Sequence, residues 1–256
     1  MANTQKKILY ICGCARSGTS ALWRLMTAHD KIAIGLERFI ERSTDEKFSL
    51  SKDLFDKERF YRLEKGDTHF KSIEKGGQGE YYAKLKDRYD DCEYYGDKVP
   101  RMFRYYNNLF EAFPKVKVLF IYRNIFDVAQ SFNARKQDPK DGWDRGYQAA
   151  VKDWNLSMRS TVNWIAKKED QILPIPYEEL FFGQYPIDNI FSFLEIEPTP
   201  TVTKLFGNLR KKAKEIEGKR EVNLSSLQKK YIMKNARFNL FKKLVELSEV
   251  SNTQTV

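Results

Sequence analysis

Short apolar, β-prone runs alternate along the chain with longer segments in which apolar residues recur at helical spacing. The apolar runs occupy residues 8–11, 31–35, 94–100, 116–122 and 172–177. The helical patterns occupy residues 18–28, 52–65, 80–90, 101–113, 125–137, 147–167, 186–195 and 224–249. The first run, Ile8 to Ile11, suits a strand buried on both faces, as in a parallel sheet. Prolines in the last run predict an edge strand or a strand end.

Small residues and a single cation fill the segment between the first strand and the first helix. Gly13 to Ser20 reads GCARSGTS, with Arg16 as its charged residue. A strand, a small-residue loop and a helix start can bind a phosphate, because backbone amides point at the anion and the helix dipole adds about half a positive charge. Arg16 adds a full charge and a forked donor. The segment is therefore a candidate anion-binding loop.

The loop differs from two known phosphate loops. Gly13 and Gly18 have the spacing of the GxxxxGK[ST] loop, but Thr19 stands where the lysine belongs. ATP and GTP hydrolases need that lysine on the β- and γ-phosphates. A phosphatase loop needs an arginine six residues after its cysteine, and Gly18 and Ser20 stand at those positions. An ordinary strand-to-helix turn with a surface arginine remains an alternative.

The charge of the chain is strongly positive. The 256 residues carry a net charge of +10, and the sequence pI is about 9.3. A basic surface suits an anionic cofactor, an acidic substrate, a membrane face or nucleic acid, and it does not choose among them. A non-enzymatic protein that binds nucleic acid or an acidic partner through the basic stretch 204–220 is therefore one alternative.

The length fits one domain over residues 1–256, with a helical insertion at about 41–92 and a basic helical part at about 198–256. Three cysteines without a CxxC pair and two histidines do not predict a disulfide framework or a zinc site. No apolar run approaches the length of a membrane span, and residues 1–7 lack the apolar core of a secretory signal. We therefore expect a cytoplasmic protein, with peripheral membrane contact left open.

Polar residues after the later strands are candidates for the same site. Glu37 follows the second strand, and such a segment lies at the carboxyl edge of a parallel sheet, beside the phosphate loop. Arg123 follows the strand at 116–122, and Ser131 lies two turns into the next helix, so the two could hold a second anion. His69 is a candidate for contact with a substrate hydroxyl. Each of these side chains also fits an ordinary surface position.

Taken together, these motifs resemble those of the sulfotransferases. CARSGTS at 14–20 resembles their 5′-phosphosulfate loop, in which a small residue or proline precedes Arg or Lys, Ser, Gly, Thr and Ser or Thr. YRNIFDVAQSF at 122–132 resembles their 3′-phosphate motif, in which a serine lies eight residues after an arginine. DKVP at 97–100 resembles the Lys-Ser/Thr-Pro element, and PYEELF at 176–181 resembles the Tyr-Glu-Asp-Leu element. The order of the motifs agrees, and the match spans most of residues 8–195.

The resemblance implies a P-loop-like α/β fold, with a central parallel sheet flanked by helices. It implies that 3′-phosphoadenosine 5′-phosphosulfate gives its sulfuryl group to an acceptor hydroxyl or amine, leaving 3′-phosphoadenosine 5′-phosphate, with no metal required. By that likeness the 5′-phosphosulfate is held by Arg16, Ser17, Gly18, Thr19 and Ser20. Arg123 and Ser131 hold the 3′-phosphate, and Tyr177 lies near the adenine.

The resemblance and the positions of the residues also suggest catalytic roles. Arg16 is placed where the leaving oxygen gains negative charge. Glu37 is the first choice for the base that takes the acceptor's proton, because relatives that act on carbohydrates often carry a glutamate after the second strand. His69 is the second choice. Lys98 neutralises sulfonate oxygens or is a surface lysine in a turn, two readings that the sequence leaves open.

The chain departs from the family pattern at three places. Ala15 replaces the usual proline before the arginine, and Asn124-Ile125 replaces a common Asn-Pro. The carboxyl-terminal Arg-Lys-Gly loop of cytosolic relatives has only Gly218-Lys219-Arg220 as a stand-in, with its order altered. The glutamate base and the absence of a steroid- or phenol-type pattern favour a carbohydrate or glycoconjugate acceptor. The lack of a secretory segment favours a bacterial cytosolic enzyme over a Golgi enzyme, and we expect no nucleic-acid partner. A P-loop-type nucleotide kinase is the other enzymatic alternative.

Overall fold

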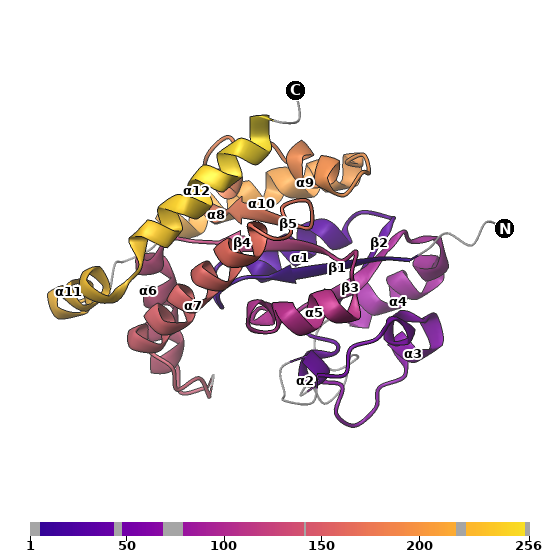
Figure 1. The fold of residues 1–256 in the computed structure, drawn as a ribbon, viewed down its shortest axis with the longest axis horizontal. Helices are drawn as coiled ribbons and strands as arrows, with labels where there is room; N and C mark the ends of the chain where they lie inside the picture. The colour runs from indigo at the N-terminus through magenta and orange to yellow at the C-terminus, as the bar shows by residue number, and fades with distance from the viewer. Residues whose placement is uncertain (1–5, 44–47, 69–78, 141, 219–223, 254–256) are drawn as a thin grey trace.

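Five parallel strands form the centre of the fold. The computed structural model describes residues 6–43, 48–68, 79–140, 142–218 and 224–253. The strands are β1 (Lys7–Cys12), β2 (Ile32–Leu36), β3 (Tyr94–Lys98), β4 (Lys117–Tyr122) and β5 (Ile172–Pro176). They form one sheet in the order β2-β3-β1-β4-β5, and every neighbouring pair is parallel (Figure 1). The α/β fold with a central parallel sheet, expected from the sequence, is confirmed.

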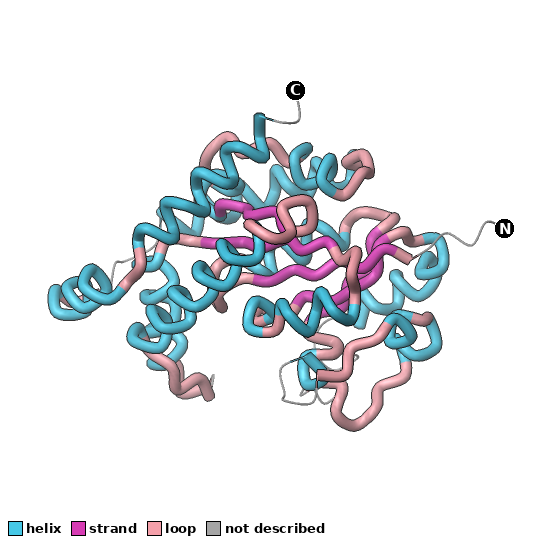
Figure 2. The backbone as a smooth tube through the Cα atoms, viewed as in Figure 1, coloured by secondary structure: helices cyan, strands magenta, loops and turns pink. Residues whose placement is uncertain are grey.

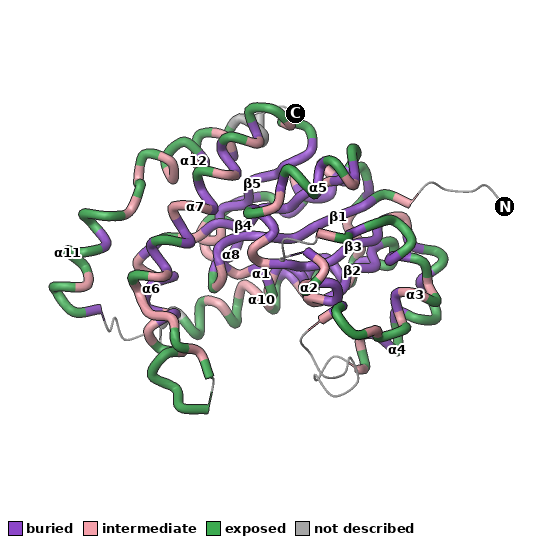
Figure 3. Tube along the Cα trace, turned by 60° about the horizontal axis from the view of Figure 1, so that its bottom comes forward, coloured by how far each residue is buried: buried purple, intermediate pink, exposed green. Residues whose placement is uncertain are grey.

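Helices cover both faces of the sheet, and Figure 2 shows the strands lying between them. Along β1, Ile8, Tyr10 and Cys12 belong to one apolar core, whereas Leu9 and Ile11 belong to the other, as alternation along a strand requires. The core around Leu9 is closed by α1 (Thr19–Thr27), α8 (Tyr177–Phe181), α9 (Asp188–Phe193) and α10 (Pro200–Gly218). The core around Tyr10 is closed mainly by α5 (Tyr106–Ala112), α6 (Ile125–Gln137), α7 (Tyr147–Ile165) and α12 (Phe238–Thr253). The strands are buried, whereas α11 (Ser226–Asn235) is mostly exposed (Figure 3).

The two edge strands are protected in different ways. Pro174 and Pro176 lie in β5, where an edge position makes their missing N–H groups harmless, as the sequence predicts. At the other edge, α4 (Gly79–Arg88) covers the end of β2. The Tyr82 hydroxyl accepts a hydrogen bond from the Leu36 amide at 3.0 Å, and the Tyr81 hydroxyl donates to the Ile34 carbonyl at 2.7 Å. The insertion therefore holds the strand that leads to Glu37.

Three expected helices are broken in the structure. The pattern at 52–65 gives a 3₁₀ turn, η1 (Lys52–Phe55), and a short helix, α3 (Lys57–Tyr61), because Asp56 is extended with ψ of 141°. The pattern at 101–113 divides at Tyr105 into the 3₁₀ turn η4 (Met102–Arg104) and α5. The single helix expected over 224–249 is wrong as well, since α11 and α12 are separated by an extended Ala236.

A tertiary contact holds the break between α11 and α12. Asn155 of α7 donates from Nδ2 to the carbonyl of Asn235 at 2.8 Å. The Oδ1 atom of Asn155 accepts from the Arg237 amide at 2.8 Å. One side chain thus binds backbone groups on both sides of the break, where a continuous helix would need those groups itself. Helical periodicity alone does not reveal such a contact.

In the part of the chain that the structure describes, every helix is too short or too polar to cross a bilayer. The remaining described elements are the short helix α2 (Ile40–Ser43) and the 3₁₀ turn η3 (Tyr89–Asp91).

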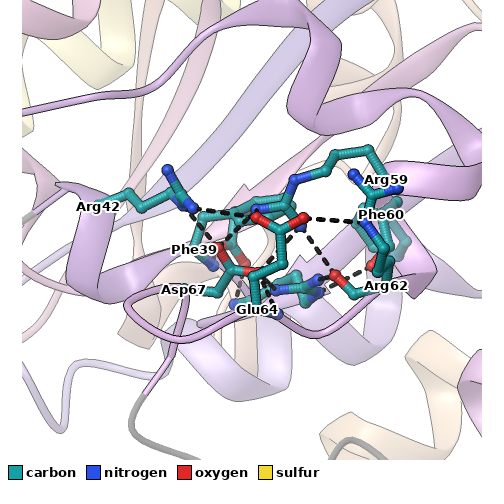
Figure 4. Close-up of polar contacts among 9 residues, drawn as sticks. Phe39, Arg42, Arg59, Phe60, Arg62, Glu64 and Asp67 are labelled. Carbon is teal, nitrogen blue, oxygen red and sulfur yellow. Dashed lines mark hydrogen bonds and ion pairs between the residues drawn. The ribbon is translucent and has the colours of Figure 1, made fainter.

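A buried ionic network fixes the segment that leaves β2. Arg38 and Asp67 are both fully buried as side chains and form an ion pair of 2.9 Å between Nη1 and Oδ2. Figure 4 shows Arg42, Arg59 and Glu64 gathered around Asp67. Arg42 reaches Asp67 at 2.5 Å and Arg59 reaches it at 2.6 Å. Burial raises the pKa of Asp67, but hydrogen bonds from Arg59, Arg42 and Arg38 outweigh it and hold that pKa well below its ordinary value.

We predict that Asp67→Asn lowers the free energy of unfolding by about 3–5 kcal/mol, since three guanidinium groups would then face one another without a carboxylate. Urea unfolding at pH 7 measures the loss. The control is Asp90→Asn in the same insertion, where the carboxylate is exposed and pairs with Lys57 at 2.7 Å. Equal, small effects of the two substitutions would contradict a structural role for the network. Because its pKa is lowered, the Asp67 contribution is present above the ordinary carboxyl pKa and is lost as the pH falls below it.

Candidate functional site

The loop between β1 and α1 presents hydrogen-bond donors at the carboxyl edge of the sheet. Gly18 is the N-cap of α1 and has a left-handed φ of 98°, which favours glycine. Because glycine has no side chain to accept from the helix, the first amides of α1 have no capping side chain. The hydroxyl of Ser17 is buried and has no hydrogen-bond partner among the described residues. Thr19 and Ser20, which open α1, are buried and exposed respectively. An oxyanion would satisfy donors of this kind.

The Tyr177 ring joins the loop to the end of β4. Tyr177 is the first residue of α8 and follows β5 directly. A Cβ atom on Gly18 would lie 2.5 Å from Cδ2 of this ring, so the ring can pack there only against glycine. The Arg123 guanidinium lies 4.1 Å from the centroid of the same ring, within cation–π distance. Arg123 also lies 3.5 Å from Asp127, measured from Nη2 to Oδ2.

One hydrogen bond connects the two anion motifs of the sequence. Arg16 donates from Nε to the Oγ of Ser131 at 2.9 Å, although 115 residues separate them along the chain. Ser131 lies on α6, which begins after Arg123 at the end of β4. The pairing of β1 with β4 places both segments at the same edge of the sheet. The structure therefore brings Arg16, Ser131, Arg123 and Tyr177 together.

Asn124 starts α6 without the proline of the family pattern. Its side chain caps the helix by accepting from the Phe126 amide at 2.8 Å. Its own amide donates to Oε1 of Glu178 at 2.9 Å, which ties the start of α6 to α8. Burial raises the pKa of the Glu178 carboxyl. The change to Asn124-Ile125 thus leaves the helix start intact.

Glu37 and Lys98 form an ion pair at the ends of β2 and β3. Their Oε1 and Nζ atoms are 2.5 Å apart, and the side chains are 19% and 3% exposed. The interpretation of Lys98 as a surface lysine is therefore wrong. The backbone after Lys98 is bonded to the loop that follows β1, since the Gly13 amide donates to the Pro100 carbonyl at 3.0 Å. Lys98 of this ion pair consequently ends the strand that neighbours β1 and its loop.

Two of the candidate residues have backbone conformations that side chains rarely adopt. Arg16 has φ of 70° and Glu37 has φ of 56°. Such conformations cost about 1–3 kcal/mol each and persist where the surrounding structure fixes them. For Glu37 the surrounding structure is Asp97, a fully buried carboxylate in β3. Asp97 accepts from the amides of Arg38 at 3.0 Å and Phe39 at 2.8 Å, directly after Glu37.

Of the two histidines, His29 lies among the described residues, and His69, the second choice for the base, does not. His29 is buried before β2, at the opposite edge of the sheet from the loop. Its ring stacks on Phe191, and its Nε2 lies 2.8 Å from the Glu197 carbonyl, so its role is structural. His69 lies outside the described residues, as do Lys219 and Arg220 of the stand-in for the carboxyl-terminal loop.

Sequence reasoning missed the buried acids that support the site. The sequence could have indicated Asp97 as a buried acid, because an aspartate inside the predicted strand YYGDK is unusual among apolar residues. The sequence does not indicate that Asp67 and Asp153 are buried, since each has polar neighbours in the chain. Their partners come from separate elements, which only the folded chain brings together.

We predict that Asp97 makes stability fall as the pH rises from about 4 to 7. Burial raises the pKa of Asp97 from 3.8 to about 7. A carboxyl whose folded pKa is raised stabilises the folded state when protonated, so its contribution is full below the ordinary pKa and is lost as the pH rises through the folded pKa. Urea unfolding at several pH values should show wild type losing about 1.4 kcal/mol per pH unit more than Asp97→Asn near pH 6. Parallel pH profiles would contradict the assignment.

Comparison with known proteins agrees with this arrangement. The model of the sulfotransferase family matches residues 9–199. The sulfotransferase domain from the curacin biosynthetic pathway has a TM-score of 0.50 and 18% identity, over 77% of this chain and 76% of that chain. The sulfotransferase domain from the Synechococcus PCC 7002 olefin synthase has a TM-score of 0.50 and 19% identity, over 77% of each chain. No curated protein sequence matches. The structures share the fold, and the family match covers most of the chain, which therefore belongs to the sulfotransferase family.

Proposed function

We propose that the protein transfers a sulfuryl group from 3′-phosphoadenosine 5′-phosphosulfate to a hydroxyl or amine of a carbohydrate or glycoconjugate. The observation that carries the proposal is the 2.9 Å hydrogen bond between Arg16 and Ser131. A donor with anions at both its 5′ and 3′ positions needs two anion sites side by side. This bond places the cation of the loop beside the serine of the second motif.

The residues around the loop fit such a donor. The uncapped amides of α1, the Ser17 hydroxyl and Arg16 are suited to the 5′-phosphosulfate, because all of them donate hydrogen bonds. Arg123 and Ser131 are suited to the 3′-phosphate. Tyr177 packs on Gly18 and Arg123 and offers an aromatic face near the adenine.

The chemistry follows from where charge develops. In sulfuryl transfer the acceptor oxygen or nitrogen bonds to sulfur while the bond from sulfur to the 5′-phosphate oxygen breaks, and that oxygen gains negative charge. Arg16 and the first amides of α1 stabilise this charge. Glu37 takes the proton that the acceptor loses. No metal ligand is assigned in this scheme.

The Glu37–Lys98 ion pair suggests a separate role for each residue in the transfer. At 2.5 Å the ammonium holds the carboxylate at the carboxyl edge of β3, next to the loop. Lys98 carries the positive charge that sulfonate oxygens attract, and Glu37 is the proton acceptor on the acceptor side. The strained φ of Glu37, fixed by Asp97, limits the positions that its side chain can take.

We predict that Arg123→Ala raises the Kd for adenosine 3′,5′-bisphosphate about tenfold or more, because a charge-assisted hydrogen bond to the 3′-phosphate is lost. Isothermal calorimetry measures the change. The affinity for 5′-AMP, which lacks that phosphate, should change little. Arg159→Ala, which removes an exposed arginine of α7, is the control. An unchanged Kd for the bisphosphate in Arg123→Ala would remove this residue from the donor site.

We predict that Glu37→Gln lowers turnover about a hundredfold or more and leaves the affinity for adenosine 3′,5′-bisphosphate nearly unchanged, because a general base acts on the acceptor's proton. Transfer of radiolabelled sulfate to a panel of carbohydrate acceptors measures turnover. Glu41→Gln, an exposed glutamate of α2, is the matched control. Near-normal turnover in Glu37→Gln would mean that another group is the base.

A further inference from the structure

Three arginines converge on one buried carboxylate beside the phosphate loop. Asp153 of α7 is 2% exposed as a side chain. Its Oδ1 lies 2.5 Å from Arg104 Nη2, and its Oδ2 lies 2.7 Å from Arg145 Nη2. Arg101 Nε lies 3.8 Å from the same Oδ2. The three arginines come from the segment after β3 and from the loop before α7, so only the fold assembles this arginine cluster.

The arginine cluster borders the loop that we assign to the donor. Arg101 follows Pro100, whose carbonyl accepts from the Gly13 amide at the start of the loop. The buried Cys14 thiol, one residue further on, is close enough to Asp153 and the three arginines to interact with their charges. The cluster is therefore adjacent to the loop, and Arg101 lies three residues beyond Lys98 on the same segment.

The charges of the cluster do not balance. Three guanidinium groups share one carboxylate, which leaves two positive charges in excess. Burial and the neighbouring charge of Arg145 lower the pKa of Arg101. The crowded positive charges of the cluster therefore repel one another. Arg145 Nη1 is buried and has no hydrogen-bond partner among the described residues. The cluster is open to solvent as well, because the side chains of Arg101, Arg104 and Arg145 are 41%, 30% and 25% exposed.

We propose that the arginine cluster binds a carboxylate, sulfate or phosphate group carried by the acceptor, so that the enzyme sulfates an acceptor that is already anionic. This inference rests on the proposed function. The anions of the donor have Arg16, Arg123 and Lys98 for their recognition. The arginine cluster lies beside these residues and supplies additional forked donors, which match planar and tetrahedral oxyanions. Asp153 holds the guanidinium groups in place and positions them.

A matched pair of probes tests the inference. In p-nitrophenyl β-D-glucuronide a carboxylate replaces the hydroxymethyl group of p-nitrophenyl β-D-glucoside, and the two are otherwise alike. Calorimetry on the full chain, with and without saturating adenosine 3′,5′-bisphosphate, gives the ratio of their Kd values. The variants are Arg101→Gln and Arg145→Gln, with Arg159→Gln on the exposed side of α7 as the control. Urea unfolding of each variant shows that it is folded, independently of its affinity for the bisphosphate.

We expect wild type and Arg159→Gln to bind the glucuronide about tenfold or more tighter than the glucoside. In Arg101→Gln and Arg145→Gln the ratio should fall toward one, while the affinity for the bisphosphate is kept. Equal binding of the two probes by wild type, or a preference that survives both substitutions, would overturn the inference. Variants that lose the bisphosphate instead would assign the cluster to the donor, which also overturns it. Failure of wild type to bind the bisphosphate would refute the proposed function separately, since the probe ratio is measured without it as well.

Discussion

The parallel pairing of β1 with β3 on one side and β4 on the other is the constraint on which the site depends. It places the ends of three strands at one edge of the sheet. β1 leads to the loop with Arg16, β3 ends at Lys98, and β4 is followed by Arg123. Each strand end contributes a cation, and the first turn of α1 contributes uncapped amides. The gathering of these cations at one edge of the sheet therefore follows from the topology.

Buried acids hold the arginines and the backbone near this edge of the sheet in place. Asp97 binds the backbone after Glu37, Asp67 holds Arg38 and its neighbours, and Asp153 gathers three more arginines. A buried carboxylate is costly unless several donors surround it, and here each has at least two. The insertion before β3 supplies part of these contacts, so it supports the site as well as covering the edge of β2. The backbone around Glu37, the residue that we propose as the base, is thereby held by buried acids.

The sequence was sufficient to predict the strands, most helices and the proximity of the two candidate anion motifs. The apolar run after Pro114 is β4, the helix over 125–137 is α6 with the expected bounds, and Arg16 and Ser131 meet. Such features can be predicted from the sequence because the local apolar pattern and the spacing of residues determine them. The breaks in the helices at Asp56, Tyr105 and Ala236 could not be predicted from the local pattern. The break at Ala236, for example, is held by the contact of the Asn155 side chain with the backbone. The Glu37–Lys98 pair was missed because 61 residues separate its members. The arginine cluster was missed because Arg101 and Arg104 lie far along the chain from Arg145 and Asp153.

The central claim is that the two motifs form one site for a nucleotide with a 3′-phosphate. Calorimetric titration of the wild-type protein without magnesium, comparing adenosine 3′,5′-bisphosphate with 5′-AMP, tests it most directly. The account predicts that the bisphosphate binds at least about tenfold tighter, because Arg123 and Ser131 recognise the extra phosphate. Equal affinity for the two nucleotides, or tighter binding of ATP that requires magnesium, would contradict it.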